Sequence, residues 1–231
     1  RDLVRSRGLG DVYKRQSIRQ TGRVPEFWHA DTGMIMEAPV WREENGRTII
    51  PYEFEPAGSV FVMFRKPSDG VDQVVEVSGG NATGGLKLKL KVEADGLAKY
   101  AEENGQWTLK TKSGKIINVL AGAVPGAVNI EGDWDVTFPL LTGVTKQVKL
   151  RPGSWSDNAD EDIKYFSGTA TYVKSVPLTR DQLSDDRRLV LDLGEIRNLS
   201  EIKVNGKDLG VSWKPPYEVE ITDVVVAGNN L

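Results

Sequence analysis

Glu201-Ile-Lys-Val-Asn-Gly-Lys-Asp-Leu-Gly210 is the stretch that decides the fold of this chain. Ile202 and Val204 alternate with polar neighbours, as they do in a strand that buries one face. Asn205-Gly206 supplies the two positive φ angles that a type I′ turn needs between antiparallel strands. The stretch therefore predicts a β-hairpin.

Further strands are expected on both sides of this hairpin. Tyr165-Phe-Ser-Gly-Thr-Ala-Thr-Tyr172 and Leu191-Asp-Leu-Gly194 precede it and are predicted to form consecutive antiparallel strands. Glu218-Val-Glu-Ile-Thr222 follows it, and its two-residue alternation predicts another half-buried strand. The last third of the chain is therefore expected to be all-β.

This run resembles the galactose-binding-like β-sandwich that accompanies many large glycoside hydrolases. The resemblance covers most of residues 129–231 and rests on the strand segments above, the Val-Asn-Gly turn and Trp213-Lys-Pro-Pro-Tyr217. Upstream, Pro25-Glu-Phe-Trp28, Asp31-Thr-Gly33 and residues 49–64 resemble a connecting segment of α-L-rhamnosidases of glycoside hydrolase family 106. In those enzymes this segment joins the catalytic barrel to accessory sandwiches. The two resemblances together imply a C-terminal fragment of such an enzyme.

The resemblance also implies partners and chemistry. Whole members of the family remove terminal L-rhamnose from plant-derived glycans with inversion, and some require calcium in the catalytic domain. A missing catalytic domain in cis and carbohydrate are thus the implied partners. The fragment itself is expected to hold no catalytic residue, no metal and no cofactor. Its compartment stays open, although the resemblance implies a periplasmic or secreted parent.

Composition excludes several other classes of protein. Of 231 residues, 39% are hydrophobic and 27% are charged, so the chain can bury a core and has no disordered bias. The net charge of −3 comes from interspersed acids and bases, which argues against nucleic acid as a partner. No apolar run reaches the roughly 20 residues of a membrane helix, so no membrane partner is expected. Cysteine is absent, which removes disulfides and Cys-based zinc sites.

Turn signals arrive about every ten residues, which predicts an all-β chain in four parts. Residues 1–20 are expected to be a non-native or disordered leader, because the first sixteen are basic and lack strand or helix periodicity. Residues 21–66 predict connecting strands, and residues 67–128 a small β-rich domain or linker. Residues 129–231 predict a galactose-binding-like jelly roll that is C-terminally truncated. At its end, Gly228-Asn-Asn230 predicts a turn and Leu231 the start of a strand.

Local patterns give the remaining elements. Strands are predicted around residues 34–36, 47–50, 59–64, 74–77, 86–92, 107–109 and 116–119. The last two are expected to form a hairpin that turns over Lys112-Ser-Gly-Lys115. Helix is scarce: one short helix is predicted to open at Asp95, with Leu97, Tyr100 and Ala101 on one face, and another at Thr179.

A catalytic pair of carboxylates is not expected in this chain. Glycoside hydrolysis needs two carboxyl groups roughly 5–10 Å apart in a pocket. A (β/α)₈ barrel to hold them takes about 250 residues with alternating helices, and those helices are not in this sequence. Glu26 is the carboxylate nearest to the resembled barrel, and we interpret it as a salt-bridged strand residue. His29, the single histidine, is interpreted as a loop or packing residue.

Three aromatic residues are the candidates for carbohydrate binding: Trp155, Trp213 and Tyr217. Aromatic faces stack on the apolar C–H faces of sugar rings. Trp155 lies in a predicted loop, and the other two flank a stiff Pro-Pro. Core packing is the alternative for all three, and it is our interpretation of Trp107 and Trp134.

The acidic run Asp157-Asn-Ala-Asp160-Glu-Asp162 clusters oxygen ligands of the kind that calcium prefers. It lacks the glycine and the third ligand of an EF-hand loop, so a solvated loop is the favoured interpretation.

The resulting hypothesis is a non-catalytic C-terminal accessory portion of a glycoside hydrolase, which packs on the catalytic domain and aids sugar recognition. An independent carbohydrate-binding module is one alternative. A purely structural β-sandwich is another, and it would leave an apolar face exposed around Val60, Phe61 and Phe64.

Overall fold

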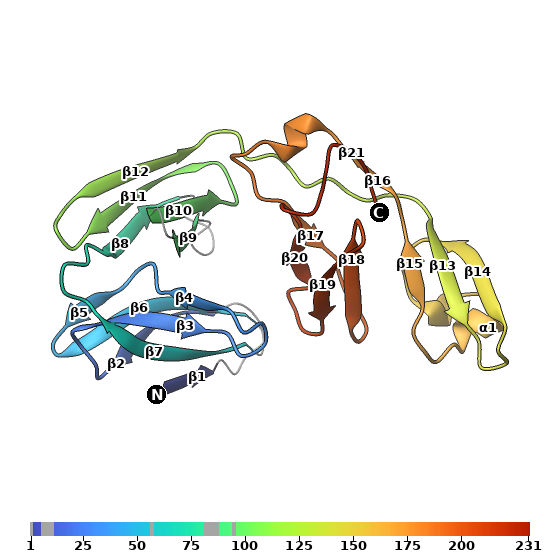
Figure 1. Ribbon diagram of the computed structural model, residues 1–231, viewed down its shortest axis with the longest axis horizontal. Helices are drawn as coiled ribbons and strands as arrows, with labels where there is room; N and C mark the ends of the chain where they lie inside the picture. The colour runs from blue at the N-terminus through green and yellow to red at the C-terminus, as the bar shows by residue number, and fades with distance from the viewer. Residues whose placement is uncertain (1, 6–11, 56–57, 81–87, 94–95) are drawn as a thin grey trace. The chain divides into compact units, whose positions relative to one another are not determined.

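The computed structural model describes residues 2–5, 12–55, 58–80, 88–93 and 96–231, with side chains from residue 15 onward. Its elements are nearly all antiparallel strands (Figure 1). The chain divides into two compact units: unit 1 is Arg1–Gly126 with Lys214–Pro216, and unit 2 is Ala127–Trp213 with Tyr217–Leu231. The all-β fold class is therefore confirmed, whereas the jelly-roll topology stays a prediction. Within the described ranges, every helix is too short or too polar to span a membrane.

The first part of unit 1 is a sandwich of two antiparallel sheets, drawn from blue to cyan in Figure 1. The strand orders are β1-β7-β3-β4 and β2-β6-β5. The bounds are β1 Asp2–Arg5, β2 Val12–Ile18, β3 Arg23–Trp28, β4 Ile35–Glu37, β5 Arg42–Glu44, β6 Arg47–Phe54 and β7 Ser59–Pro67. Alternate side chains turn inward, so Phe27 and Val62 from one sheet meet Ile50 and Phe54 from the other in a buried core.

Two of these strands lie in residues 1–20, where the sequence predicted none. β1 pairs with β7, and β2 pairs with β6 over its whole length. Ile18 at the end of β2 is buried in the sandwich core. The expectation of a segment without strand structure is therefore wrong for these described stretches. A neighbouring strand with a clear pattern can pair with a segment whose own pattern is weak, because strand formation depends on context.

The sandwich also corrects the apolar face expected on β7. Val60 is buried in the core, and Phe64 packs against the same cluster. Phe61, which has the opposite orientation in the strand, is half-buried. Alternation divides these residues between two faces of the sheet, so they do not form one exposed surface.

The rest of unit 1 has a three-stranded sheet, β12-β11-β8, and a hairpin, β9-β10. The bounds are β8 Val74–Gly79, β9 Leu88–Glu93, β10 Gly96–Ala101, β11 Gly105–Thr111 and β12 Ile116–Ala121. The predicted hairpin over residues 112–115 is confirmed by the pairing of β11 with β12 and by Gly114 at φ +89°. Trp107 is buried with Leu109, which confirms its place in the core.

The helix predicted to open at Asp95 is wrong. Residue 95 itself lies outside the described residues, and the next six form strand β10. Leu97 and Ala101 face Val92 and Leu88 of β9 in an antiparallel register. A six-residue helix would be marginal in water, and cross-strand pairing with β9 outweighs the weak helical pattern.

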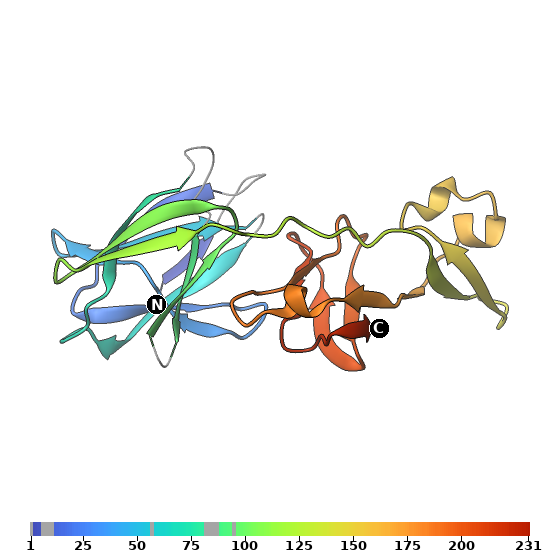
Figure 2. The ribbon, with the colours of Figure 1, turned by 90° about the horizontal axis from the view of Figure 1, so that it is seen from above.

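Unit 2 consists of short paired strands and small helices. The strand groups are β14-β13-β15, β16-β21, β17-β20 and β18-β19. The bounds are β13 Trp134–Pro139, β14 Thr145–Leu150, η1 Trp155–Asp157, α1 Glu161–Lys164, β15 Thr171–Val173, β16 Val176–Leu178, η2 Arg180–Leu183, β17 Val190–Asp192, β18 Ser200–Val204, β19 Lys207–Ser212, β20 Glu218–Glu220 and β21 Gly228–Asn230. Figure 2 shows α1 beside the β13–β15 sheet, and its Ile163 is buried with Val136 and Phe138.

Three predictions in unit 2 are confirmed. The hairpin of β18 and β19 turns at Asn205 and Gly206, with φ angles of 51° and 79°. The segment starting at Glu218 forms strand β20, which pairs with β17. The short helix at Thr179 is η2, and the Thr179 and Gln182 side chains cap it reciprocally.

Two predicted elements of unit 2 are wrong. Only Thr171–Val173 is a strand in the segment predicted from residue 165, because α1 ends there and the chain turns to bring Phe166 into the core. The C-terminal turn is instead strand β21, paired with β16. The buried Asn230 side chain donates to the Val226 and Gly228 carbonyls, which fixes this segment in place.

Candidate carbohydrate-binding site

Trp155 packs against the protein's own aromatic rings. It lies in η1, half-buried, and its ring centre is 5.4 Å from that of Phe138 and 5.5 Å from that of Phe166. Its indole N–H donates to the Tyr172 hydroxyl at 2.6 Å. The Trp155 ring therefore packs against other rings of the protein, and its only hydrogen-bond donor, the indole N–H, already has an acceptor. These contacts favour the core alternative, and a role in carbohydrate binding stays a prediction.

Trp213 and Tyr217 have different surroundings. Trp213 is 57% exposed, whereas Tyr217 is half-buried and its carbonyl accepts a hydrogen bond from the Leu193 amide at 2.9 Å. Among the described residues, Trp155 shares no ring contact with either of them. The three candidates are therefore not joined into a single aromatic platform by direct contact.

The segment between them carries a polar group that the sequence did not single out. In unit 1, the Lys214 ammonium contacts Asp31 Oδ2 at 3.0 Å and Glu55 Oε2 at 2.5 Å. The Lys214 side chain is only 19% exposed. Asp31 is held in the β3–β4 turn, and Glu55 directly follows β6. The only sequence signal was the position of Lys214 in the Trp-Lys-Pro-Pro motif.

Charge and burial shift several pKa values in this cluster. Burial would raise the pKa of Asp31, but the hydrogen bond and charge of Lys214 lower it overall. Burial would lower the pKa of Lys214, but Glu55 and Asp31 raise it overall. Burial lowers the pKa of His29, which Asp31 and Glu55 only partly oppose. Burial, with Glu55 and Asp31, raises the pKa of Tyr52 to about 12.

The recess at this cluster is too small for a sugar. Its free volume is about 10 Å³, and it is lined by His29, Asp31, Tyr52, Phe54, Glu55, Gly58, Ser59 and Lys214. That space holds about one water, whereas ligand pockets span roughly 300–1,000 Å³. Lys214 also neutralises both carboxylates, so neither is poised as a general acid. The cluster therefore suits a structural ion pair rather than hydrolysis.

A larger hollow lies in unit 2 over β13 and β14. It encloses about 300 Å³ and is lined by Asp135, Val136, Thr137, Gln147, Val148 and Lys149. Lys149 is paired with Asp135 at 2.7 Å, on the face of the strands that points away from the aromatic core. Because no aromatic side chain lines it, this hollow offers no surface for stacking a sugar.

Glu26 is a salt-bridged strand residue, as interpreted from the sequence. Its side chain in β3 is 1% exposed, and Oε2 accepts hydrogen bonds from Arg65 Nε at 2.8 Å and Trp28 Nε1 at 3.0 Å. Burial alone would raise the pKa of Glu26, but these two bonds and the Arg65 charge lower it overall. The group is therefore held as a carboxylate, which is unsuited to donating a proton.

Two carboxylates of the acidic run 157–162 are paired with one lysine of the chain. Lys146 contacts both Asp160 and Asp162, and Asp160 also caps α1 by accepting from the Asp162 amide at 3.1 Å. In the described ranges, no group of three or more acidic, His or Cys side chains is arranged to hold a metal ion.

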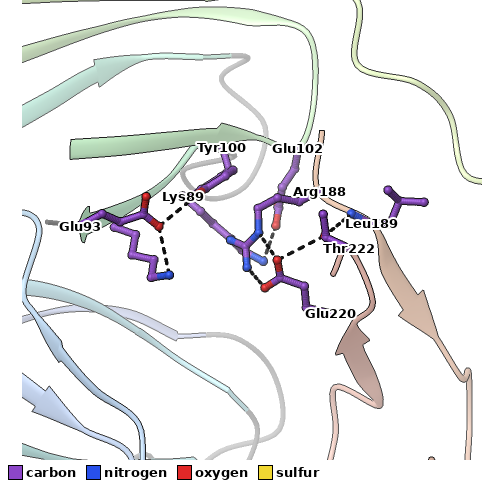
Figure 3. A network of polar contacts seen from close by, with 9 residues as sticks. Lys89, Glu93, Tyr100, Glu102, Arg188, Leu189, Glu220 and Thr222 are labelled. Carbon is purple, nitrogen blue, oxygen red and sulfur yellow. Dashed lines mark hydrogen bonds and ion pairs between the residues drawn. The ribbon is translucent and has the colours of Figure 1, made fainter. Parts of the chain in front are cut away.

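Further ion pairs lie within each unit, and Figure 3 draws several of them as dashed lines. In unit 1, Lys91 contacts Glu93 at 3.1 Å on β9, and Lys89 pairs with Glu102. In unit 2, Arg188 Nε donates to Glu220 at 2.8 Å. These are surface pairs between partly exposed side chains, and each contributes little to stability.

Comparisons with known proteins point to carbohydrate-active enzymes. No family model matches the chain. A curated protein of Formosa agariphila named "Putative beta-glucuronidase" is 33% identical in an alignment of 168 residues, which covers 71% of this chain and 14% of that protein. The solved structure of a rhamnosidase from Novosphingobium sp. PP1Y matches 99% of this chain and 17% of its own, with a TM-score of 0.66 and 26% identity.

The chain is similar to parts of glycoside hydrolases. This result supports the glycoside hydrolase resemblance of the sequence without singling out one family. The chain spans 14% and 17% of the lengths of these two proteins, so their activities describe much longer molecules.

Proposed function

We propose that this chain is a non-catalytic C-terminal accessory portion of a multidomain glycoside hydrolase. The observation that carries the proposal is the match of 99% of the chain to 17% of a rhamnosidase structure. A match that covers nearly all of one chain and a small part of the other is expected when the shorter chain corresponds to one region of a longer enzyme. The all-β fold and the neutralised state of Glu26 and Asp31 fit a region without catalytic carboxylates.

The intact enzyme in this proposal is an α-L-rhamnosidase of the family 106 type, acting on plant-type glycans. The rhamnosidase match and the sequence motifs of residues 25–64 and 165–217 support this assignment. The "Putative beta-glucuronidase" match supports the broader class of glycoside hydrolase. The accessory portion packs on the catalytic domain and aids recognition of the sugar.

Exposed apolar side chains in unit 2 favour packing against a domain over an independent binding module. Leu199, which directly precedes β18, is 64% exposed, and Val211 within β19 is 54% exposed. The other large apolar side chains of unit 2 with more than half of their surface exposed are Val128, Leu141, Val144, Tyr165, Val190, Trp213, Val226 and Leu231. Groups of exposed apolar side chains usually mark surfaces that another protein region covers.

We therefore expect the isolated chain to bind the apolar dye ANS and to self-associate as its concentration rises. The double variant Leu199→Ser, Val211→Thr should reduce both effects several-fold without lowering the urea midpoint of unfolding. Glu201→Ser, Lys207→Ser on the same hairpin is the matched control and should change neither. A wild-type chain that stays monomeric and dye-free would contradict the packing role and favour an independent module.

A further inference from the structure

The outer face of the β7-β3-β4 sheet in unit 1 differs from the core face. Register places Trp28 of β3 opposite Phe61 of β7 and Ile35 of β4, and Glu26 opposite Met63. Because side chains alternate, all of these lie on the face opposite to Phe27 and its buried partners. Ile35 is exposed, and Trp28, Phe61 and Met63 are half-buried. This outer face thus combines apolar surface with the buried carboxylate of Glu26.

Arg65 on the same face is held in one position. Its Nε donates to Glu26 Oε2 at 2.8 Å, and its guanidinium carbon lies 4.9 Å from the centre of the Trp28 ring. Trp28 donates to the same Glu26 oxygen at 3.0 Å, which orients the indole. The three side chains therefore fix one another, and the guanidinium has little freedom left to lose on binding a ligand.

The outer edge of this guanidinium is unoccupied. The Arg65 side chain is 52% exposed, and among the described residues neither terminal nitrogen has a hydrogen-bond partner. Two terminal NH₂ groups in one plane match the two oxygens of a carboxylate. The charge near this edge is suited to an anion. Arg65 and Lys66 are paired with Glu26 and Glu37, and Arg23 adds a further cation by donating to the Arg65 carbonyl at 2.7 Å.

We infer that Arg65 and the adjoining apolar side chains form a binding site for an acidic sugar. The terminal nitrogens of Arg65 take the sugar carboxylate, and the C–H face of the ring lies over the apolar surface of Phe61, Met63 and Ile35. Glu26 and Trp28 position the guanidinium. The inference rests on the sugar-recognition role proposed above and names the class of sugar.

NMR titration of the whole chain tests this site directly. The Trp28 indole N–H is the reporter, because it shares its acceptor with Arg65. We expect methyl β-D-glucuronide to shift this signal saturably, with an affinity at least tenfold higher than that of methyl β-D-glucoside. Arg65→Gln should abolish the difference between the two sugars. Arg65→Lys, which keeps a charge beside Glu26, should reduce it about fivefold or more because the bidentate fork is lost.

Arg42→Gln is the matched control, since Arg42 is a partly exposed, ion-paired arginine in the other sheet of the sandwich, and it should leave the titration unchanged. Equal affinity for both sugars in the wild type would overturn the inference. Shifts of the Trp28 indole signal that are equally large with sodium acetate would also overturn the inference, because the site would then bind anions in general. The dye-binding result for Leu199 and Val211 does not depend on Arg65, so the two proposals can fail separately.

Discussion

Replacing Trp155 with alanine should destabilise unit 2 by about 2–4 kcal/mol. The change removes an indole that contacts Phe138 and Phe166, and it leaves the Tyr172 hydroxyl without its donor. A large-to-small change in a packed aromatic cluster costs the transfer energy and leaves a cavity. Urea unfolding followed by near-ultraviolet circular dichroism measures the loss.

Trp213→Ala is the matched control, because the Trp213 side chain is 57% exposed. It should change the free energy of unfolding by less than about 0.5 kcal/mol. If Trp155→Ala leaves stability intact and instead weakens retention on an immobilised glycan, then Trp155 is a ligand platform and its structural interpretation fails.

Replacing Lys214 with methionine should destabilise unit 1 by about 1–3 kcal/mol at neutral pH. Methionine keeps most of the side-chain stem but leaves Asp31, whose side chain is 22% exposed, without its cation. The Glu55 contact adds little, since the Glu55 side chain is 52% exposed. Lys203→Met is the matched control, because Lys203 and its partner Glu201 are each 58% exposed. It should have almost no effect.

The effect of Lys214→Met should depend on pH in a defined direction. Folding lowers the pKa of Asp31 from 3.8, so the stabilisation is present above that value and is lost as the pH falls through the folded pKa. Folding raises the pKa of Lys214 from 10.5, so the stabilisation is lost as the pH rises through the folded pKa. The difference between wild type and variant should therefore be largest at about pH 5–9. A difference that stays constant down to pH 2 would contradict the ion-pair account.

Elements with local turn chemistry could be predicted from the sequence. Asn205-Gly206 takes the two positive φ angles of its turn, and residues 112–115 turn between β11 and β12. The same rule applies to Asn45-Gly46 between β5 and β6, with φ angles of 51° and 72°. These turns depend on the residues within them, so the two that were predicted, at residues 205–206 and 112–115, needed no distant contact to be recognised.

Elements defined by distant partners could not be predicted. β10 has a weak helical pattern and is a strand because of β9, and β21 depends on the hydrogen bonds of Asn230. The surroundings of the candidate site residues could not be predicted either, because they also depend on residues distant in the sequence. The sequence marked Trp155 as a loop aromatic but could not bring Phe138 and Phe166 beside it, and it gave no sign that Arg65 would meet Glu26.

Hydrolysis of 4-nitrophenyl α-L-rhamnopyranoside by the purified chain tests the central proposal most directly. We predict release of nitrophenol at the rate of buffer alone, because Glu26 and Asp31 are each held by a cation, and Glu55, which lies beside Asp31, is paired with the same Lys214. Turnover above buffer by the wild-type chain that disappears in Glu26→Gln would contradict the proposal, since the chain would then carry a catalytic carboxylate of its own.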